Sequence, residues 1–255
     1  MASRDLRILP AARLVMACHI TGVYDVNRNT VLKDDYYELV QEWALSVMAF
    51  GLQGIIFHNN FSEETCEKYE NSNISFIKID YDPQFNPNVY RYFIYRDFLQ
   101  LYSKYIESVF VTDISDVVML KNPFADPYFI DNPATIFCGD EPKTLGDEWM
   151  VAHAAHLRNK IPDYAVYEAR FEQEKLLNCG IIGGGIGIFS DFIQKLCTIH
   201  QSFNSDNQTA FTGDMGAFNY LARSRFNSQL KHGAPVNTVF KMYENDRTDC
   251  WFRHK

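Results

Sequence analysis

An apolar, β-branched run in the middle of the chain ends abruptly in two carboxylates. Residues Val109 to Phe124 read Val-Phe-Val-Thr-Asp-Ile-Ser-Asp-Val-Val-Met-Leu-Lys-Asn-Pro-Phe, and the two acids are Asp113 and Asp116. Such a run predicts a strand, and ligands of α/β proteins bind where strands end. Carboxylate oxygens are the hard ligands that Mg²⁺ and Mn²⁺ prefer. The segment therefore indicates either a metal site or an ordinary acidic turn, and the rest of the chain must decide.

The composition permits one large α/β domain. The chain has 255 residues, of which 47% are hydrophobic, which is ample for a core. The formal net charge is −8 and no Lys/Arg run is present, so nucleic acid is not an expected partner. No signal peptide or transmembrane segment is visible, and the six cysteines lack Cys-x-x-Cys spacing, as in reduced proteins. We therefore expect a cytoplasmic protein without a transmembrane segment.

Strand and helix patterns alternate in the first half of the chain. Strands are expected at Arg13–Ile20, Gly54–His58 and Ser75–Ile79. Helical spacing of apolar residues predicts one helix from Tyr36 to Met48 and a longer one from Tyr92 to Ile106. Asp35 and Glu38 stand at the positions of a capping box for the first helix, and Gly51 ends it. This alternation predicts a mostly parallel sheet with helices on both faces.

The second half is less regular. A strand is expected at Ala134–Cys138, irregular helix and loop over Glu141–Lys175, and a glycine-rich strand-turn-strand over Leu177–Ile188. Two helices follow, one over Phe192–Phe203 and one from about Asp214, and then a late strand at Val236–Phe240. No linker or repeat interrupts the pattern. We expect a single domain over residues 1–255, with a regular half (about 1–120) and a smaller, irregular half (about 121–255) that supplies the other wall of the ligand crevice.

The carboxyl ends of parallel strands meet at one edge of a sheet, and ligands bind there. This rule places several polar residues around one crevice: Thr21, Gly22, Asn59, Asn60, Asp113 and Asp116. Side chains three apart on a regular strand point to opposite faces, so both aspartates reach one ion only if the chain turns at Ile114-Ser115. Otherwise one aspartate binds the ion, while the other binds a ribose hydroxyl or orders the loop.

An arginine lies on the apolar side of the second predicted helix. Arg96 follows Tyr92 by four residues and precedes Leu99 by three, so its charge must be paired. It either pairs with a core carboxylate or faces the diphosphate of a bound ligand, and we count it among the candidate contacts to such a ligand. Arg91, near the start of the same helix, is less constrained and can be solvated.

Further candidates lie in the second half. Asn178 to Gly185 reads Asn-Cys-Gly-Ile-Ile-Gly-Gly-Gly, which indicates either a tight turn or bulge, or a wall against a flat ligand with Asn178 binding a hydroxyl. Asp214 is either a first-turn helix acid or a base that orients an acceptor. The terminal His254 and Lys255 would fray unless the preceding Trp-Phe pair pins them. Carboxylates and an aromatic face suit a sugar, so Asp147, Glu148 and Trp149 are either candidate acceptor contacts or parts of a surface loop.

The order of these motifs resembles that of nucleotide-diphospho-sugar glycosyltransferases of the GT-A fold. The motifs are the strand with Asp-x-x-Asp-Val-Val, Asn-Pro-Phe, Leu-Asn-Cys-Gly-Ile-Ile-Gly-Gly, Gly-Asp-Met-Gly-Ala-Phe-Asn and the final His-Lys. The resemblance covers nearly the whole chain, from Leu14 onward. In that family an Asp-x-Asp at a strand end binds Mn²⁺ or Mg²⁺ and the donor ribose. The resemblance implies this role for Asp113 and Asp116, which have one extra residue between them.

The resemblance also implies the other ligand contacts. His254 would complete the metal shell and Lys255 would lie near the diphosphate. The donor would further contact Asn178 and Gly180, together with Thr21, Gly22 and Tyr24 from the loop after the first strand. The implied activity is transfer of a sugar from a nucleoside-diphosphate sugar to a glycan or other hydroxyl acceptor. The half of about 1–120 would then bind the nucleotide, and the half of about 121–255 the sugar and the acceptor.

Charge sets the expected chemistry. A divalent cation would stabilise the negative charge on the departing diphosphate. Transfer with inversion needs a base at the acceptor hydroxyl, for which Asp214 is the candidate, whereas transfer with retention needs only a carboxylate beside the developing cation. Two other functions stay open. One is a phosphatase or phosphotransferase with Asp113 as nucleophile, disfavoured by the mid-chain position and the spacing. The other is a non-catalytic module that binds nucleotide sugars.

Overall fold

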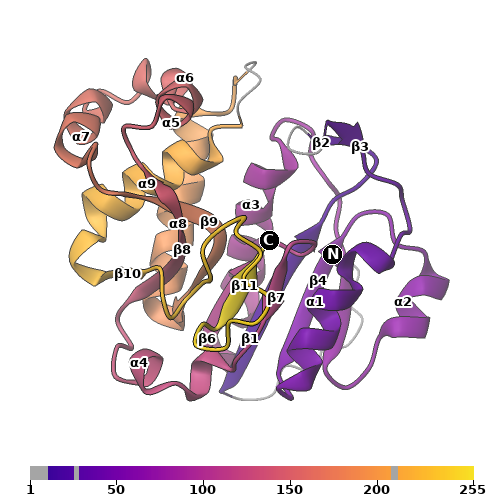
Figure 1. Ribbon diagram of the computed structural model, residues 1–255. Helices are drawn as coiled ribbons and strands as arrows, with labels where there is room; N and C mark the ends of the chain where they lie inside the picture. Colours follow the sequence, from indigo (N-terminus) through magenta and orange to yellow (C-terminus); the bar gives the residue numbers. More distant parts are fainter. Residues whose placement is uncertain (1–10, 26–28, 208–211) are drawn as a thin grey trace.

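The computed structural model describes residues 11–25, 29–207 and 212–255, and a seven-stranded sheet forms its centre (Figure 1). Its strands are β1 (Ala12–His19), β4 (Gln53–His58), β5 (Ile74–Lys78), β6 (Ile106–Thr112), β8 (Ile136–Thr144), β9 (Lys175–Gly185) and β10 (Leu230–His232). The order is β10-β8-β9-β6-β1-β4-β5. β9 runs antiparallel to both of its neighbours, and the other pairs are parallel. The predicted mostly parallel α/β sheet is confirmed.

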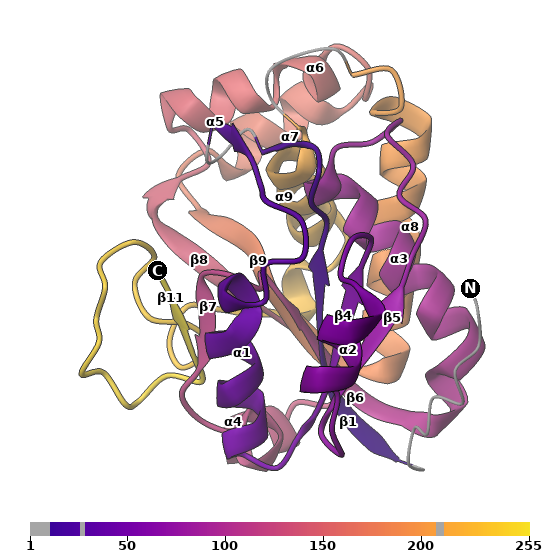
Figure 2. The ribbon, with the colours of Figure 1, turned by 90° about the vertical axis from the view of Figure 1, so that its right-hand side faces the viewer.

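Helices cover both faces of this sheet (Figure 2). One face carries α3 (Pro87–Tyr102), α8 (Ile186–Phe203) and α9 (Asp214–Arg225). The other carries α1 (Glu38–Ala49) and a small antiparallel sheet of β7 (Val117–Met119) and β11 (Phe252–His254). The remaining elements are short: β2 (Tyr24–Asp25), β3 (Thr30–Val31), α2 (Glu63–Tyr69), α4 (Pro127–Ile130), α5 (Glu148–His153), α6 (Ala155–Arg158) and α7 (Tyr164–Phe171).

Large aromatic side chains fill the core on both faces. Tyr92, Phe98 and Phe192 are fully buried on the α3/α8 face, and Trp43 and Trp251 on the α1/β11 face. An aromatic side chain removes 150–250 Å² from water, so these residues dominate the burial energy. Residues from both halves of the chain pack in each cluster, so the two halves share one sheet and one pair of core layers.

The first helix begins later than its sequence predicts. The prediction of a capping box is wrong, because α1 starts at Glu38 and its N-cap residue, Tyr37, makes no side-chain hydrogen bond to the helix. Asp35 instead has φ +54°, and its carboxylate accepts a hydrogen bond from the Ser62 amide at 2.9 Å. The predicted end of the helix is confirmed, since Gly51 takes the left-handed conformation with φ +66°.

The glycine-rich segment is one strand rather than a strand-turn-strand. β9 continues to Gly185, and α8 begins at the next residue. The glycines serve close packing, because a Cβ on Gly183 would overlap the Phe110 ring of the neighbouring strand. The predicted strand at Val236–Phe240 is also wrong, since only an isolated bridge joins Asn237 to Phe252.

The end of the chain is held in the fold. Trp251 and Phe252 are buried, and β11 pairs with β7 beside the acidic turn, so the predicted anchoring of the tail is confirmed. Across the described ranges, no helix is both long enough and apolar enough to cross a membrane. The cytoplasmic location remains a prediction.

Candidate metal and ligand site

The acidic turn lies between β6 and β7, at the carboxyl edge of the parallel strands. The Asp113 amide donates to the Gly180 carbonyl at 2.7 Å, which extends the β6–β9 ladder by one residue. The chain then turns over Ile114, which is buried, and re-enters a strand at Val117. This turn brings Asp116 round beside Asp113, as a shared ion requires.

The structure brings the three predicted metal ligands together. Asp113, Asp116 and His254 each offer one ligand atom, and these atoms lie within 4.8 Å of one another. His254 Nε2 is 3.8 Å from Asp113 Oδ2 and 3.9 Å from Asp116 Oδ2. In an octahedral shell with bonds of about 2.1 Å, neighbouring ligands lie about 3.0 Å apart and opposite ligands about 4.2 Å apart. The two carboxylates and the imidazole are donors that a divalent cation accepts, and their separations are close to this range, although nothing in the cluster identifies which cation.

His254 is in the protonation state that metal binding requires. The residue is 1% exposed, its ring packs edge-on against Phe240 at 4.5 Å, and its amide donates to Thr238 Oγ1 at 3.2 Å. Burial lowers the pKa of His254 to about 4, against an opposing effect of the Asp113 charge. The imidazole is therefore neutral near neutral pH, with a nitrogen available to an ion.

Arg91, rather than Arg96, is the arginine of this site. Arg91 is buried, and its guanidinium pairs with Asp113 Oδ1 and donates to the Cys179 carbonyl at 3.3 Å. Arg96 does not pair with a core carboxylate, because its partner is its exposed neighbour Asp97 at 2.7 Å. Five residues turn a helix by about 140°, so the two arginines point in different directions. Arg91 lies near the start of α3, where that helix meets the sheet edge, but apolar spacing does not distinguish it from Arg96.

Gly180 packs directly against the candidate metal ligands. A Cβ at this position would lie 2.5 Å from His254 Cε1, 2.6 Å from Asp113 Oδ2 and 2.9 Å from Asn178 Oδ1. The Gly180 amide donates to Asn178 Oδ1 at 2.7 Å. The β8–β9 register shifts after Cys138, so the site lies beside a bulge, where strands often re-aim side chains. Asn178 and Gly180 thus lie at the site, as predicted.

Glu141 is a residue of this region that sequence reasoning missed. It lies in the extension of β8, and its Oε1 accepts a hydrogen bond from Asn178 Nδ2 at 2.8 Å. It is 9% exposed. Burial raises the pKa of Glu141, while the Asn178 hydrogen bond and the more distant charges of Lys241 and Lys143 oppose the rise. The segment was expected to be irregular, and no sequence signal separates Glu141 from the surface acids that follow it.

Asp214 is buried at the start of α9. Its carboxylate accepts a hydrogen bond from Thr212 Oγ1 and lies 3.3 Å from His153 Nε2 and 3.6 Å from Cys179 Sγ. Burial acts to raise the pKa of Asp214, but the hydrogen bond and charge of His153, together with Arg91, hold it well below its usual range. Asp214 is therefore a fixed anion and a weak base.

The loop after β1 is tied to the loop after β4. The Thr21 amide donates to Asn59 Oδ1 at 3.0 Å, and Asn60 Nδ2 donates to the Thr21 carbonyl at 3.1 Å. Gly22 has φ +76°, which favours glycine. The structure thus joins Thr21, Gly22, Asn59 and Asn60, as the parallel-sheet rule predicted. Tyr24 is 52% exposed at the start of β2, where it pairs with Val31.

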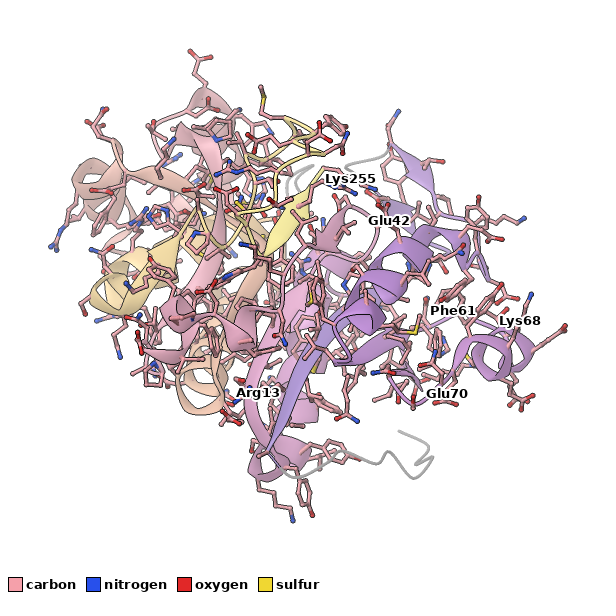
Figure 3. All side chains as sticks on the ribbon, turned by 60° about the horizontal axis from the view of Figure 1, so that its bottom comes forward. Arg13, Glu42, Phe61, Lys68, Glu70 and Lys255 are labelled. Carbon is pink, nitrogen blue, oxygen red and sulfur yellow. The ribbon has the colours of Figure 1, made fainter. Side chains whose placement is uncertain are left out.

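Lys255 reaches α1 rather than the acidic turn. Its amine pairs with Glu42, and Figure 3 shows the two side chains next to each other. Its backbone amide contacts the acidic turn by donating to the Asp116 carbonyl at 2.8 Å. Glu42 also pairs with Arg253 at 2.8 Å. The lysine thus lies next to the candidate ligands in the chain, with its charge held by a neighbouring carboxylate.

The predicted acceptor contacts form the start of α5. Asp147 caps this helix by accepting from the Trp149 amide at 3.1 Å, and it pairs with Lys143 at 3.2 Å. Its carboxylate is therefore already engaged. Glu148 is exposed, and Trp149 is 42% exposed with its ring 4.9 Å from that of His153. Glu148 and Trp149 therefore remain open to a ligand.

No protein-family model matches the chain, and no curated protein sequence matches it.

Proposed function

We propose that the chain transfers a sugar from a nucleoside-diphosphate sugar to a hydroxyl acceptor, with the help of a divalent cation. The observation that carries the proposal is the cluster of Asp113, Asp116 and His254 at the carboxyl edge of the parallel strands. Ligands of open α/β sheets bind at this edge, and an ion there can bridge protein carboxylates and phosphate oxygens. The family resemblance of the motif order points the same way.

The residues around the cluster suit this reaction. Asp113, Asp116 and His254 would hold the cation, which when bound would stabilise the charge on the leaving diphosphate. Arg91 pairs with one oxygen of Asp113 and leaves the other directed at His254, so the carboxylate is held in place. Lys255 directly follows His254, and its amine would leave Glu42 to bind the diphosphate.

The donor has further contacts available. Asn178 and Gly180 lie beside the candidate ligands, and Thr21 and Gly22 belong to the loop that would receive the base and ribose. Asp214 is a fixed anion whose low pKa suits stabilisation of positive charge at the sugar better than acceptance of a proton. The acceptor would approach past Trp149 and Glu148.

Calorimetric titration tests the proposal. UDP-glucose, UDP-galactose, UDP-N-acetylglucosamine and GDP-mannose would each be titrated with Mn²⁺ present and then with EDTA. We expect at least one to bind with Mn²⁺ and to bind at least tenfold more weakly with EDTA. Asp116→Asn should abolish the effect of Mn²⁺, while Asp191→Asn, in an exposed pair on α8, should not. Absence of binding by any nucleotide sugar would refute the proposal.

A further inference from the structure

Glu141 is a buried carboxylate without a basic partner. It is 9% exposed, and its hydrogen-bond partner is the neutral Asn178 amide. Within residues 11–25, 29–207 and 212–255, none of the ion pairs includes it. A buried charge is costly unless it is paired, so such a carboxylate is expected mainly where a function needs it.

Asn178 connects this carboxylate to the candidate metal site. One end of its amide accepts from the Gly180 amide at 2.7 Å, and the other end donates to Glu141 at 2.8 Å. Gly180 in turn packs against His254 and Asp113. Because both ends of the Asn178 amide are occupied, the orientation of the amide is fixed. Glu141 is thus held one side chain away from the place where a donor diphosphate would lie.

The two buried carboxylates near the site differ in their surroundings. Asp214 has a cationic or hydrogen-bonding partner on each side, and its pKa lies well below the usual range. Glu141 has one amide partner, and burial raises its pKa. A general base is most effective when its pKa is near the working pH, and carboxylates whose environments push their pKa values apart take different roles.

We propose that Glu141, and not Asp214, is the catalytic base that accepts the proton of the acceptor hydroxyl, and that transfer therefore inverts the anomeric centre. This inference rests on the proposed function. The acceptor proton passes to the Glu141 carboxylate while the acceptor oxygen forms its bond to the anomeric carbon. The bond from that carbon to the β-phosphate oxygen breaks, and its electron pair leaves with the diphosphate. Attack opposite the leaving group gives inversion.

Glu141→Gln tests this role, because glutamine keeps the hydrogen bond from Asn178 and loses the basic oxygen. With the nucleotide sugar that binds best and a panel of methyl glycosides as acceptors, we expect kcat to fall by about 10²- to 10⁴-fold. The donor dissociation constant, measured by calorimetry with Mn²⁺, should stay within threefold of wild type. Transfer to azide should also persist, because azide carries no proton to remove. Glu172→Gln, at an exposed glutamate after α7, is the matched control and should leave all three unchanged.

The anomeric configuration of the wild-type product provides a second test that needs no variant. Proton NMR should show inversion, and retention would overturn the inference. It would also be overturned if Glu141→Gln kept its transfer rate, or if transfer to azide fell as much as transfer to glycosides. In each of these outcomes the protein still binds the nucleotide sugar, so failure of this inference is distinguishable from failure of the proposed function. A wild-type protein that binds no nucleotide sugar overturns both.

Discussion

Gly180→Ala should damage the candidate metal site while leaving the strands around it in place. The new Cβ would lie 2.5 Å from His254 Cε1 and 2.6 Å from Asp113 Oδ2. The imidazole would have to retreat by about 0.9 Å to reach an ordinary contact of 3.4 Å. His254 is 1% exposed and packed against Phe240, and Asp113 is held by Arg91, so neither side chain can simply rotate away.

The expected magnitudes follow from this crowding. Overpacking a well-packed site typically costs about 1–3 kcal/mol, which urea unfolding would report as a loss of stability. Displacing the surroundings of metal ligands typically lowers metal affinity by about 10- to 100-fold. Calorimetric titration of Mn²⁺ into the wild type and into Gly180→Ala would measure that loss. The expected cause of this loss is steric, because the new Cβ enters the ligand cluster itself.

Gly187→Ala is the matched control for this prediction. A Cβ on Gly187 would meet nothing within 4 Å, and the residue lies in the first turn of α8. Alanine there should stabilise the protein by about 0.5–1 kcal/mol, because glycine loses more backbone freedom on folding. If Gly180→Ala bound Mn²⁺ as tightly as wild type and unfolded at the same urea concentration, the close packing of Gly180 against the ligands would be refuted.

Two further substitutions test features away from the ligands. His200 is fully buried, and burial lowers its pKa to about 4 from an ordinary 6.5. Between these two pH values the unfolded chain binds more protons at this residue than the folded protein does. The free energy of unfolding therefore falls as the pH drops from 6.5 to 4. One pKa unit corresponds to about 1.4 kcal/mol, so His200→Gln should reduce the loss of unfolding free energy between pH 7 and pH 4.5 by up to about 3 kcal/mol, as measured by urea unfolding. An unchanged loss in the variant would contradict the lowered pKa of His200. Glu42→Gln weakens the pairs with Arg253 and Lys255, both solvent-accessible, and should cost less than about 1 kcal/mol by the same assay. A loss above about 2 kcal/mol would show that these pairs fix the tail.

The regular strands could be predicted because their composition leaves few alternatives. β4, β5 and β6 are short apolar runs, and their alternation with helices gave the parallel sheet and the edge where ligands bind. The same edge rule grouped the loops after β1 and β4 with the acidic turn. Local apolar runs thus determine which elements exist, and the topology of the sheet determines which of their ends meet.

The arginine of the site could not be predicted because α3 is buried almost all round. Residues 91–95 are consecutive buried positions, so apolar spacing does not indicate which face points toward the strand edge. Glu141 was missed for a related reason. Its burial depends on β8 extending beside β9, a pairing between distant segments that leaves no local pattern. In both cases the polar residue is placed by tertiary packing rather than by its own neighbours in sequence.

The placement of His254 shows how a residue next to the end of the chain can be fixed as firmly as one on a central strand. Trp251 is fully buried, and its Nε1 donates to Asp126 Oδ2 at 2.8 Å. Burying about 200 Å² of tryptophan at about 25 cal/mol per Å² contributes roughly 5 kcal/mol, several times the value of the solvent-accessible pairs that Glu42 makes. The tail is therefore held mainly by its aromatic anchor, and the strand pairing of β11 with β7 then sets His254 opposite Val117, directly after Asp116. Because the ligand cluster depends on this anchor, the geometry of the candidate site is linked to the packing of the core behind it.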